Sequence, residues 1–382
     1  MTTRELDALL ALVRPEIRAI HAYKTPLDPL PVKLDANESP FSLPPEVTED
    51  LGRVAAGLAL ERYPDLEVRA LREALAGWIG TSPSRLVVGV GSDESIAVLL
   101  TALARPRDRE APVVVLPDPT FVMYAQTARV LGVEPVSVPL VGRDFALDVE
   151  RTIDTIRAHR AACTFLASPN NPTGVVYDDA ALLTIAEACP TTWVVVDEAY
   201  GAYRARSHRA ALVPHTRERA PNLVFMGTLS KIGLAALRIG WLEAPEPLAH
   251  ELDKVRLPYN MPAPSQALGA RLLTVHRAVL EARIADVVRE RVRVIGAIGA
   301  LHRDRGWIRA VPTEANFVLC ELRSDAIARA AHAHLASCGI QVRAFSRAPL
   351  DRHLRITFGR PEENTALLEA FSSFAPDATG PR

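Results

Sequence analysis

Short runs of apolar residues alternate with longer helical segments along the first two thirds of the chain. The runs are RLVVGVG at 85–91, PVVVLP at 112–117, CTFLAS at 163–168, WVVVDEAY at 193–200 and NLVFMG at 222–227. Continuous apolar strands are typical of a sheet that helices cover on both faces. Because helical segments separate these runs, right-handed crossovers and a mostly parallel sheet are predicted, in a large α/β domain.

The remaining segments predict further elements around this sheet. A helix is expected from about residue 66, where apolar positions recur with helical spacing. A helical tract over 265–302 leads to three strand candidates separated by one helix, which predict a smaller α+β domain. The Pro-rich first forty or so residues show little periodicity and predict an extended arm. We therefore expect an arm over 1–45, a large domain over 46–264 and a small domain over 265–382.

Composition and charge exclude several classes of protein. With 48% hydrophobic and 23% charged residues, the chain is an ordinary globular protein, and its net charge of −1 without a basic block argues against a nucleic-acid partner. The cysteines at 163, 189, 320 and 338 show no CxxC spacing, so we expect reduced core residues and no metal site. Charges interrupt the apolar positions of the N-terminus, so we expect no signal peptide, no membrane span and a cytoplasmic location.

Polar segments that follow the predicted strands carry the candidate chemistry. They are GSDES at 91–95, SPNNPTG at 168–174, DEAY at 197–200 and TLSK at 228–231. In sheets of this kind, ligands gather at the carboxyl ends of the strands. The four segments are therefore expected to meet at one site.

Two ionisable residues in these segments suit chemistry on a ring cofactor. Lys231 follows a buried strand and can form a Schiff base if desolvation lowers its pKa, although most loop lysines are merely solvated. Asp197 ends a buried strand, where a carboxylate is costly unless it meets a cation. A pyridinium nitrogen is such a cation, and the alternative for Asp197 is a helix cap.

Other residues of the set suit the remaining groups of such a cofactor. Asn171 and Tyr200 can donate to a phenolate oxygen, and Phe121 can stack on a pyridine face, although each also suits a turn or the core. A phosphate needs N–H groups at a helix start, hydroxyl groups and a cation. The residues that supply these are Ser92, Asp93, Thr228, Ser230 and Arg238, while GSDES is also a plausible helix cap.

Taken together, SPNNPTG, VVVDEAY, TLSK and LRITFG resemble the fold-type I aminotransferases that depend on pyridoxal 5′-phosphate (PLP), over essentially the whole chain. KLDANESP at 33–40, RYPD at 62–65 and GSDES resemble the histidinol-phosphate branch of that superfamily. The resemblance implies a large PLP-binding domain with a mostly parallel sheet, a smaller α+β domain and an N-terminal arm.

The resemblance also assigns roles to individual residues. Lys231 would hold PLP as a Schiff base and shuttle a proton, Asp197 would pair with the pyridine nitrogen, and Asn171 and Tyr200 would contact the phenolate oxygen. The residues expected around the phosphate are Ser92, Asp93, Thr228, Ser230 and Arg238, with Phe121 stacked on the ring. The interval from Lys231 to Arg238 is one residue shorter than the family pattern.

Further residues of the resemblance concern the substrate and a second subunit. Tyr63, in RYPD, would reach the cofactor phosphate of a neighbouring subunit, which implies a homodimer with shared sites. Arg355 would bind the anionic group of the substrate, with Arg343 as its companion, since two planar guanidinium groups suit a phosphate. Tyr23 would close over the substrate from the arm, although AYKTPLDPL departs from the usual Pro-Tyr-x-Pro-Gly run of this branch.

The expected activity is ping-pong transamination of histidinol phosphate with 2-oxoglutarate, giving imidazole-acetol phosphate and glutamate in histidine biosynthesis. Two other enzymes remain open: an aminotransferase for aromatic amino acids, and a phosphothreonine-type PLP decarboxylase. A transcription regulator with an aminotransferase-like domain would need a DNA-binding module, for which the residues before KLDANESP are too few and not basic. Pocket shape decides among such substrates by a few kcal/mol.

Overall fold

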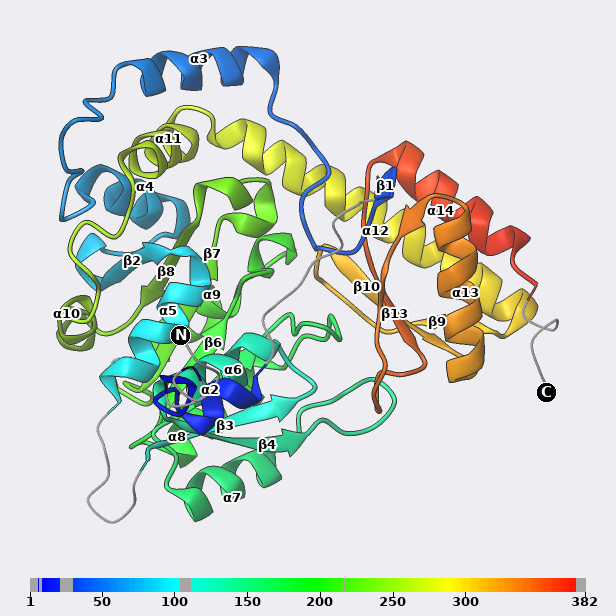
Figure 1. The fold of residues 1–382 in the computed structure, drawn as a ribbon, viewed down its shortest axis with the longest axis horizontal. Helices are drawn as coiled ribbons and strands as arrows, with labels where there is room; N and C mark the ends of the chain where they lie inside the picture. Colours follow the sequence, from blue (N-terminus) through cyan, green and yellow to red (C-terminus); the bar gives the residue numbers. More distant parts are fainter. Residues whose placement is uncertain (1–5, 7–8, 21–29, 104–110, 216–217, 376–382) are drawn as a thin grey trace.

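The structure, a computed structural model, describes residues 6, 9–20, 30–103, 111–215 and 218–375, and it contains two main sheets (Figure 1). The larger sheet has seven strands in the order β2-β8-β7-β6-β5-β3-β4. They are β2 (Leu86–Val90), β3 (Val113–Asp118), β4 (Glu134–Pro139), β5 (Cys163–Ala167), β6 (Trp193–Asp197), β7 (Leu223–Thr228) and β8 (Ile239–Glu243). The run from β4 to β7 is parallel, and β8 lies antiparallel between β7 and β2. The mostly parallel sheet predicted from the sequence is therefore confirmed.

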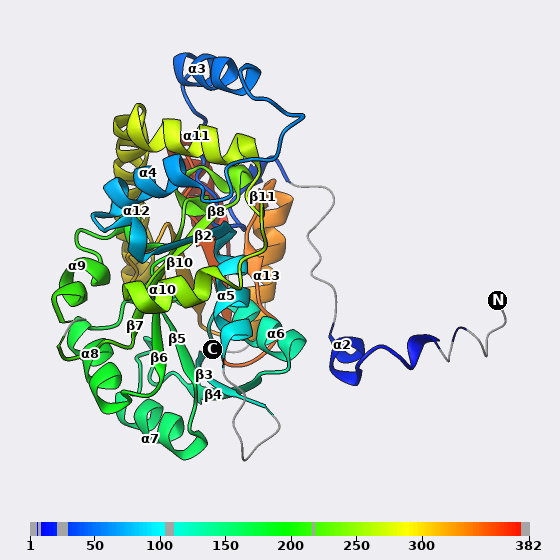
Figure 2. The ribbon, with the colours of Figure 1, turned by 90° about the vertical axis from the view of Figure 1, so that its left-hand side faces the viewer.

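Helices cover both faces of this sheet, as Figure 2 shows. They are α4 (Arg69–Ile79), α5 (Gly91–Ala102), α6 (Val122–Leu131), α7 (Val149–His159), α8 (Asp179–Ala188), α9 (His208–Leu212), α10 (Glu246–Asp253) and α11 (Ala263–Thr274). Helix α3 (Pro45–Ala56) lies outside this layer, against α11. Successive strand residues point to opposite faces. Val114 and Leu116 pack in the cluster that contains residues of α5, α6 and α10, whereas Val113 and Val115 pack in the cluster with α7, α8 and α9. Burial on both faces explains the continuous apolar runs.

The smaller sheet is antiparallel, with four strands in the order β12-β13-β10-β9. Its strands are β9 (Ile308–Ala310), β10 (Phe317–Leu322), β12 (Arg343–Ala344) and β13 (His353–Thr357), and its helices are α12 (Arg277–Arg305), α13 (Asp325–Ser337) and α14 (Pro361–Ser373). Nearby, β1 (Val32–Lys33) pairs in parallel with β11 (Ile340–Gln341). The segment just before the large domain is thus joined, in a separate two-stranded sheet, to a strand that lies between α13 and β12 in the chain.

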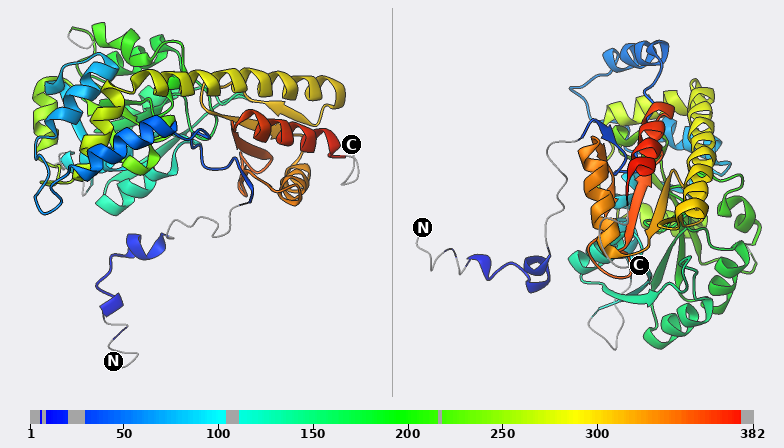
Figure 3. Two further views of the ribbon diagram at one scale, coloured as in Figure 1. Left: turned by 90° about the horizontal axis from the view of Figure 1, so that it is seen from above. Right: turned by 90° about the vertical axis from the view of Figure 1, so that its right-hand side faces the viewer.

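One helix connects the two cores. The long helix α12 runs from one core to the other (Figure 3). Leu280, near the start of α12, packs in the cluster with α4 and α11, whereas Val287, Val294 and Ile298 pack under the smaller sheet. The helical tract expected over 265–302 is in fact two helices, and the first of them, α11, packs against α3 and α4. The domain boundary near residue 264 stays a prediction.

Several local features complete the fold. Short helix α2 (Pro15–Ala19) contacts α6. Short 3-10 helices occur at Pro83–Arg85, Gly201–Tyr203, Val213–His215, Ser230–Ile232 and Ala235–Leu237. Cys338 is exposed, so the expectation of four core cysteines is wrong for this residue, which lies at the end of α13. Among the described residues, no helix has both the length and the apolar character needed to cross a membrane.

Candidate active site at the carboxyl ends of the strands

A cavity of about 240 Å³ opens where β5, β6 and β7 end. The carboxyl ends of parallel strands share one edge of a sheet, so the segments that follow them meet there. The cavity brings together ten residues singled out from the sequence: Ser92, Asp93, Phe121, Asn171, Asp197, Tyr200, Thr228, Ser230, Lys231 and Arg238.

Lys231 is the amine of this cavity. It lies in the 3-10 helix Ser230–Ile232, which follows β7 after one intervening residue. Its Nζ is 5.9 Å from the centroid of the Tyr200 ring. The hydroxyl of Tyr203 donates to the Lys231 carbonyl over 2.6 Å and so fixes the backbone that carries the amine. The amine is thereby aimed into the cavity from a held position.

Asp197 is a buried carboxylate with two hydrogen-bond donors. Its Oδ1 accepts from the Ala199 N–H at 2.8 Å, and its Oδ2 accepts from the Tyr124 hydroxyl. Burial raises the pKa of Asp197 to about 6, although the two hydrogen bonds act in the opposite direction. Burial, followed by the neighbouring Asp197 charge, also raises the pKa of Tyr124 well above its ordinary value. A cation beside Asp197 would offset the cost of burial.

Sequence reasoning missed Tyr124. The residue lies in the first turn of α6, three positions after Phe121, and the two rings pack edge to face at 5.5 Å. This spacing puts the two side chains on one side of the helix. The helical spacing in DPTFVMY was the available signal, but an aromatic residue in an apolar helix is ordinarily core.

Asn171 is joined to Arg355 across the two sheets. Arg355 Nη1 donates to Asn171 Oδ1 at 2.6 Å, and Nη2 donates to the Asp35 carbonyl at 2.7 Å. Arg343 is directly opposite Arg355 in the β12–β13 pair. Like charges at opposed positions repel, so an anion bound between them would be stabilising.

Tyr200 has a partner that the sequence did not reveal. Asn37 is buried with 1% exposure, and its Nδ2 donates to the Tyr200 hydroxyl oxygen at 3.0 Å. The KLDANESP motif drew attention to this segment, but no spacing rule connects residue 37 with residue 200. Asn37 itself does not line the cavity, whereas its neighbours Ala36 and Glu38 do.

The start of α5 forms a cradle of bare backbone. Gly91 has a φ of 75°, a left-handed conformation that favours glycine, and it opens the helix. A Cβ on Gly240 of β8 would lie 2.3 Å from the Gly91 carbonyl carbon and 2.5 Å from Ser92 N. Two glycines therefore allow the strand and the helix start to approach closely. Free N–H groups at a helix start are suited to a phosphate.

Hydroxyl groups and a guanidinium surround this cradle. Thr228 Oγ1 is 2.9 Å from Ser230 Oγ, and Arg238 Nη1 is 3.4 Å from the same oxygen. Arg238 Nη2 is 3.2 Å from Asp93 Oδ2. The short interval between Lys231 and Arg238 therefore does not keep the guanidinium away from the cluster. Arg238 adopts a left-handed φ of 52° just before β8.

Glu94, which the sequence analysis did not single out, holds the start of α5 in place. Glu94 Oε2 accepts from Val90 N at 2.5 Å and from Asn260 Nδ2 at 2.7 Å. Asn260 Oδ1 in turn accepts from Arg256 Nη1 at 2.9 Å. The first turn of α5 is therefore tied to the segment that precedes α11.

Four predicted residues are not among the described residues that line this cavity. Arg355 reaches it through Asn171, and the other three lie away from it or outside the described part of the chain. Tyr63 is 82% exposed and stacks on Tyr259 at a centroid distance of 4.7 Å, so it does not line the cavity of its own chain. Arg343 is exposed on β12. Tyr23 falls within 21–29, outside the described residues.

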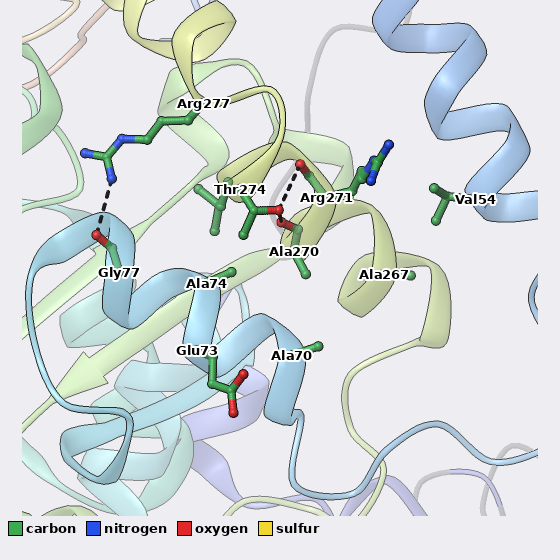
Figure 4. A pocket seen from close by; sticks show the side chains of 11 residues that line it. Val54, Ala70, Glu73, Ala74, Gly77, Ala267, Ala270, Arg271, Thr274 and Arg277 are labelled. Carbon is green, nitrogen blue, oxygen red and sulfur yellow. Dashed lines mark hydrogen bonds between the residues drawn. The ribbon is translucent and has the colours of Figure 1, made fainter.

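Figure 4 shows a second hollow, of about 680 Å³, between α3, α4 and α11. Alanine and glycine make up five of its eleven lining residues. Three of its polar side chains are engaged locally: Arg271 with Asp50, Arg277 with the Gly77 carbonyl and Thr274 with the Ala270 carbonyl. The smaller cavity is the better candidate for an active site, because it contains a converging amine, carboxylate, amide and phosphate cradle.

Residues 31–371 match the family model for aminotransferase class I and II. The chain belongs to this family of aminotransferases, enzymes that act on small molecules. It is 37% identical over 375 residues to the histidinol-phosphate aminotransferase of Paracidovorax citrulli, covering 97% of this chain and 99% of the relative. Identity to the histidinol-phosphate aminotransferase of Chromobacterium violaceum is 38% over 366 residues, covering 95% of this chain and 98% of the relative.

A solved structure has the same fold. The histidinol-phosphate aminotransferase from Sinorhizobium meliloti, in complex with pyridoxal 5′-phosphate, superposes with a TM-score of 0.82. Its sequence identity is 26%, and the match covers 96% of this chain and 99% of that chain. The predicted fold class and family resemblance are confirmed.

Proposed function

We propose that the protein binds pyridoxal 5′-phosphate and transfers an amino group between histidinol phosphate and 2-oxoglutarate, forming imidazole-acetol phosphate and glutamate. The observation that carries the choice of substrate is the opposed pair Arg343 and Arg355, because two guanidinium forks can share the oxygens of one phosphate. The names of the near full-length relatives support the same choice.

The residues of the cavity fit the cofactor. Asp197 is buried and its pKa is raised by burial, so a pyridinium N–H would supply the cation that this carboxylate lacks. The glycine-built cradle, with Ser92, Thr228, Ser230 and Arg238, has the donors that a phosphate needs. PLP supplies an electron sink for the negative charge left on the substrate when its α-proton departs.

The chain's own groups would do the remaining work. Lys231 Nζ would anchor the cofactor, give way to the substrate amine and then carry the proton that leaves the substrate's α-carbon. Asp197 would hold the proton on the ring nitrogen. Asn171 and Tyr200 would stabilise the phenolate charge, and Phe121 would pack on the ring.

Arg355 would serve both half-reactions. Its contact with Asn171 places the guanidinium beside the cavity, where it can bind the phosphate of one substrate and a carboxylate of the other. Arg343 would add a second fork for the phosphate. This sharing would allow one site to accept a phosphorylated amine and a dicarboxylate.

The exposed surface around Tyr63 supports a homodimer. Leu60 and Leu257 are 75% and 69% exposed, and Tyr63 stacks on Tyr259 beside them in the chain. Exposed apolar groups of this kind are typical of an interface. Tyr63 would then complete the phosphate site of the second subunit. A biosynthetic role would place the dimer in the cytoplasm.

The deciding experiment mixes PLP-loaded protein with L-histidinol phosphate, without an acceptor, and records the cofactor absorbance. We expect the absorbance to change and to recover when 2-oxoglutarate is added. Histidinol phosphate has no carboxyl group, so a parallel mixture with L-threonine O-3-phosphate tests the other enzyme: release of carbon dioxide there would indicate the phosphothreonine-type decarboxylase instead. A response to phenylalanine or tyrosine, but not to histidinol phosphate, would indicate the aromatic aminotransferase.

A further inference from the structure

We propose that Asn37 is a positioning residue that directs the hydroxyl proton of Tyr200 into the cofactor site. The inference rests on the proposed cofactor site and is independent of which amine the enzyme takes. Asn37 Nδ2 donates to the Tyr200 hydroxyl oxygen at 3.0 Å. A hydroxyl has one proton to donate and can accept through its lone pairs. Because Tyr200 accepts from Asn37, its own proton is available for a second partner.

The orientation of the Asn37 amide follows from Thr357. Thr357 Oγ1 accepts from the Asn37 backbone N–H at 2.9 Å and lies 3.2 Å from Asn37 Oδ1, to which it donates. If the amide were flipped, Nδ2 would face the Thr357 hydroxyl and that buried hydroxyl proton would lose this acceptor. Thr357 thus specifies Oδ1 as the acceptor and leaves Nδ2 for Tyr200.

The backbone of Asn37 is held as firmly as its side chain. Its φ is 55°, and its carbonyl accepts from Asn316 Nδ2 at 3.0 Å. Asn316 precedes β10, and Thr357 ends β13, so both anchors belong to the smaller sheet. Asparagine tolerates the left-handed conformation better than most residues. The residue type therefore suits both the backbone and the amide.

Tyr200, on the other side of this contact, belongs to the larger sheet. It follows β6 by three residues and lines the cavity with Asp197 and Lys231. Ala36 and Glu38 also line the cavity, whereas Asn37 turns away to meet Tyr200 and Thr357. Asn37 therefore acts through Tyr200 and has no expected contact with the cofactor.

A hydroxyl group that accepts one hydrogen bond becomes a stronger donor in another, because linked hydrogen bonds polarise one another. The Asn37 amide should therefore strengthen the bond from Tyr200 to the phenolate oxygen and stabilise its negative charge. If this support is lost, the protonated form of the bound cofactor should be favoured relative to its deprotonated form. The pH midpoint at which the cofactor absorbance changes should therefore rise.

The test compares Asn37→Asp, Asn37→Ala and Tyr200→Phe in PLP-loaded protein by spectrophotometric pH titration. A carboxylate at position 37 keeps the shape and the bond from Thr357 but attracts the Tyr200 proton to itself. We expect each single variant to raise the midpoint by about one unit, as for loss of one hydrogen bond to a charged group. In Asn37→Ala combined with Tyr200→Phe, the shift should not exceed that of Tyr200→Phe alone.

The matched control is Asn222→Ala. Asn222 is also buried, and its Nδ2 lies within 3.1 Å of the carbonyls of Ala186, Cys189 and Thr192. The backbone carbonyl of Asn222 accepts from the Val194 N–H near the start of β6. Asp197 lies at the other end of this strand, so the control is remote from the cavity. Asn222→Ala should lower thermal stability and leave the midpoint unchanged.

The outcomes separate the two proposals. A midpoint that moves in Tyr200→Phe but not in either Asn37 variant overturns the role of Asn37 and keeps the cofactor site. Additive shifts in the double variant would also overturn it. Unmodified protein that shows no cofactor absorbance would overturn the proposed function, and this inference with it.

Discussion

Arg355 Nη1 donates to Asn171 Oδ1 across 2.6 Å, so a residue of the smaller sheet holds a residue of the cofactor cavity. The two groups proposed to bind substrate and cofactor are therefore in direct contact. An anion that binds the guanidinium competes for the same donor, so substrate binding should be felt at Asn171.

Replacement of the two arginines should separate their contributions. Arg355→Lys should lower kcat/KM for histidinol phosphate and for glutamate by about 10- to 100-fold, because a lysine cannot form the planar fork. Arg343→Lys should affect histidinol phosphate more than glutamate. Steady-state kinetics with both amines would check this, with Arg329→Lys, an exposed partner of Asp325, as control. Equal losses for both substrates in Arg343→Lys would contradict a phosphate role.

Covalent attachment can be tested directly, since the chain has lysines only at positions 24, 33, 231 and 254. Lys33 and Lys254 pair with Glu38 and Glu251. Borohydride reduction of PLP-loaded protein should therefore add the cofactor mass to the peptide that contains Lys231, as read by mass spectrometry. Lys231→Ala should lose both this label and turnover, whereas Lys254→Ala should keep them. A label on another lysine would refute the assignment.

The buried Asp197 predicts a pH dependence of stability in the cofactor-free protein. Its pKa is raised from 3.8 to about 6, so between these values the folded chain retains a proton that the unfolded chain has lost. Stability should therefore fall as pH rises from about 4 to 6, by about 2–3 kcal/mol for this group. Urea unfolding of Asp197→Asn should show a smaller decline, because burial also raises the pKa of Glu198, to about 7, and this group still contributes. An equal decline in both proteins would show that Asp197 is not responsible.

The phosphate cradle should not tolerate a single added methyl group. Gly240→Ala would place a Cβ 2.3 Å from backbone at Gly91, so the start of α5 must shift. We expect cofactor affinity, measured by fluorescence titration, to fall at least about 100-fold, as for loss of charge-assisted bonds.

Gly296→Ala on α12 is the matched control, because a Cβ there meets nothing within 4 Å. It should bind cofactor normally and gain about 0.5–1 kcal/mol of stability, as alanine favours a helix over glycine. Normal affinity in Gly240→Ala would show that the cradle lies elsewhere.

A hybrid-dimer experiment tests the role of Tyr63. Lys231→Ala and a second variant, Tyr63→Phe with unaltered Lys231, are each expected to have little activity alone. In a hybrid dimer, the Lys231→Ala subunit would lend its Tyr63 to the partner site, which retains Lys231. Mixing after mild denaturation should therefore restore up to one active site per dimer. Absence of recovery, with sedimentation confirming dimers, would place Tyr63 outside the shared site.

The sequence predicted the central sheet well because burial on both faces leaves continuous apolar runs, as in β5 and β6. It did not reveal β4, an edge strand that contains Pro135 and Pro139, residues that strand patterns ordinarily exclude. Nor did it reveal β8, which enters the sheet antiparallel between β7 and β2.

The candidate site was predictable where residues follow strands and not where they depend on tertiary contacts. Asp197 and Lys231 were accessible to sequence reasoning because parallel topology brings strand ends together. Tyr124 and Asn37 act through partners 73 and 163 positions away. No local pattern reports such pairings, so only the folded arrangement identifies them.

The length of α12 determines how far a small tilt of this helix would move its ends. From Leu280 in one core to Ile298 in the other, the helix rises by about 27 Å at 1.5 Å per residue. A tilt of roughly 5° about one end would therefore move the other by about 2 Å over this span. A straight helix of this length would therefore convert a small change in angle between the two cores into a displacement of ångström size.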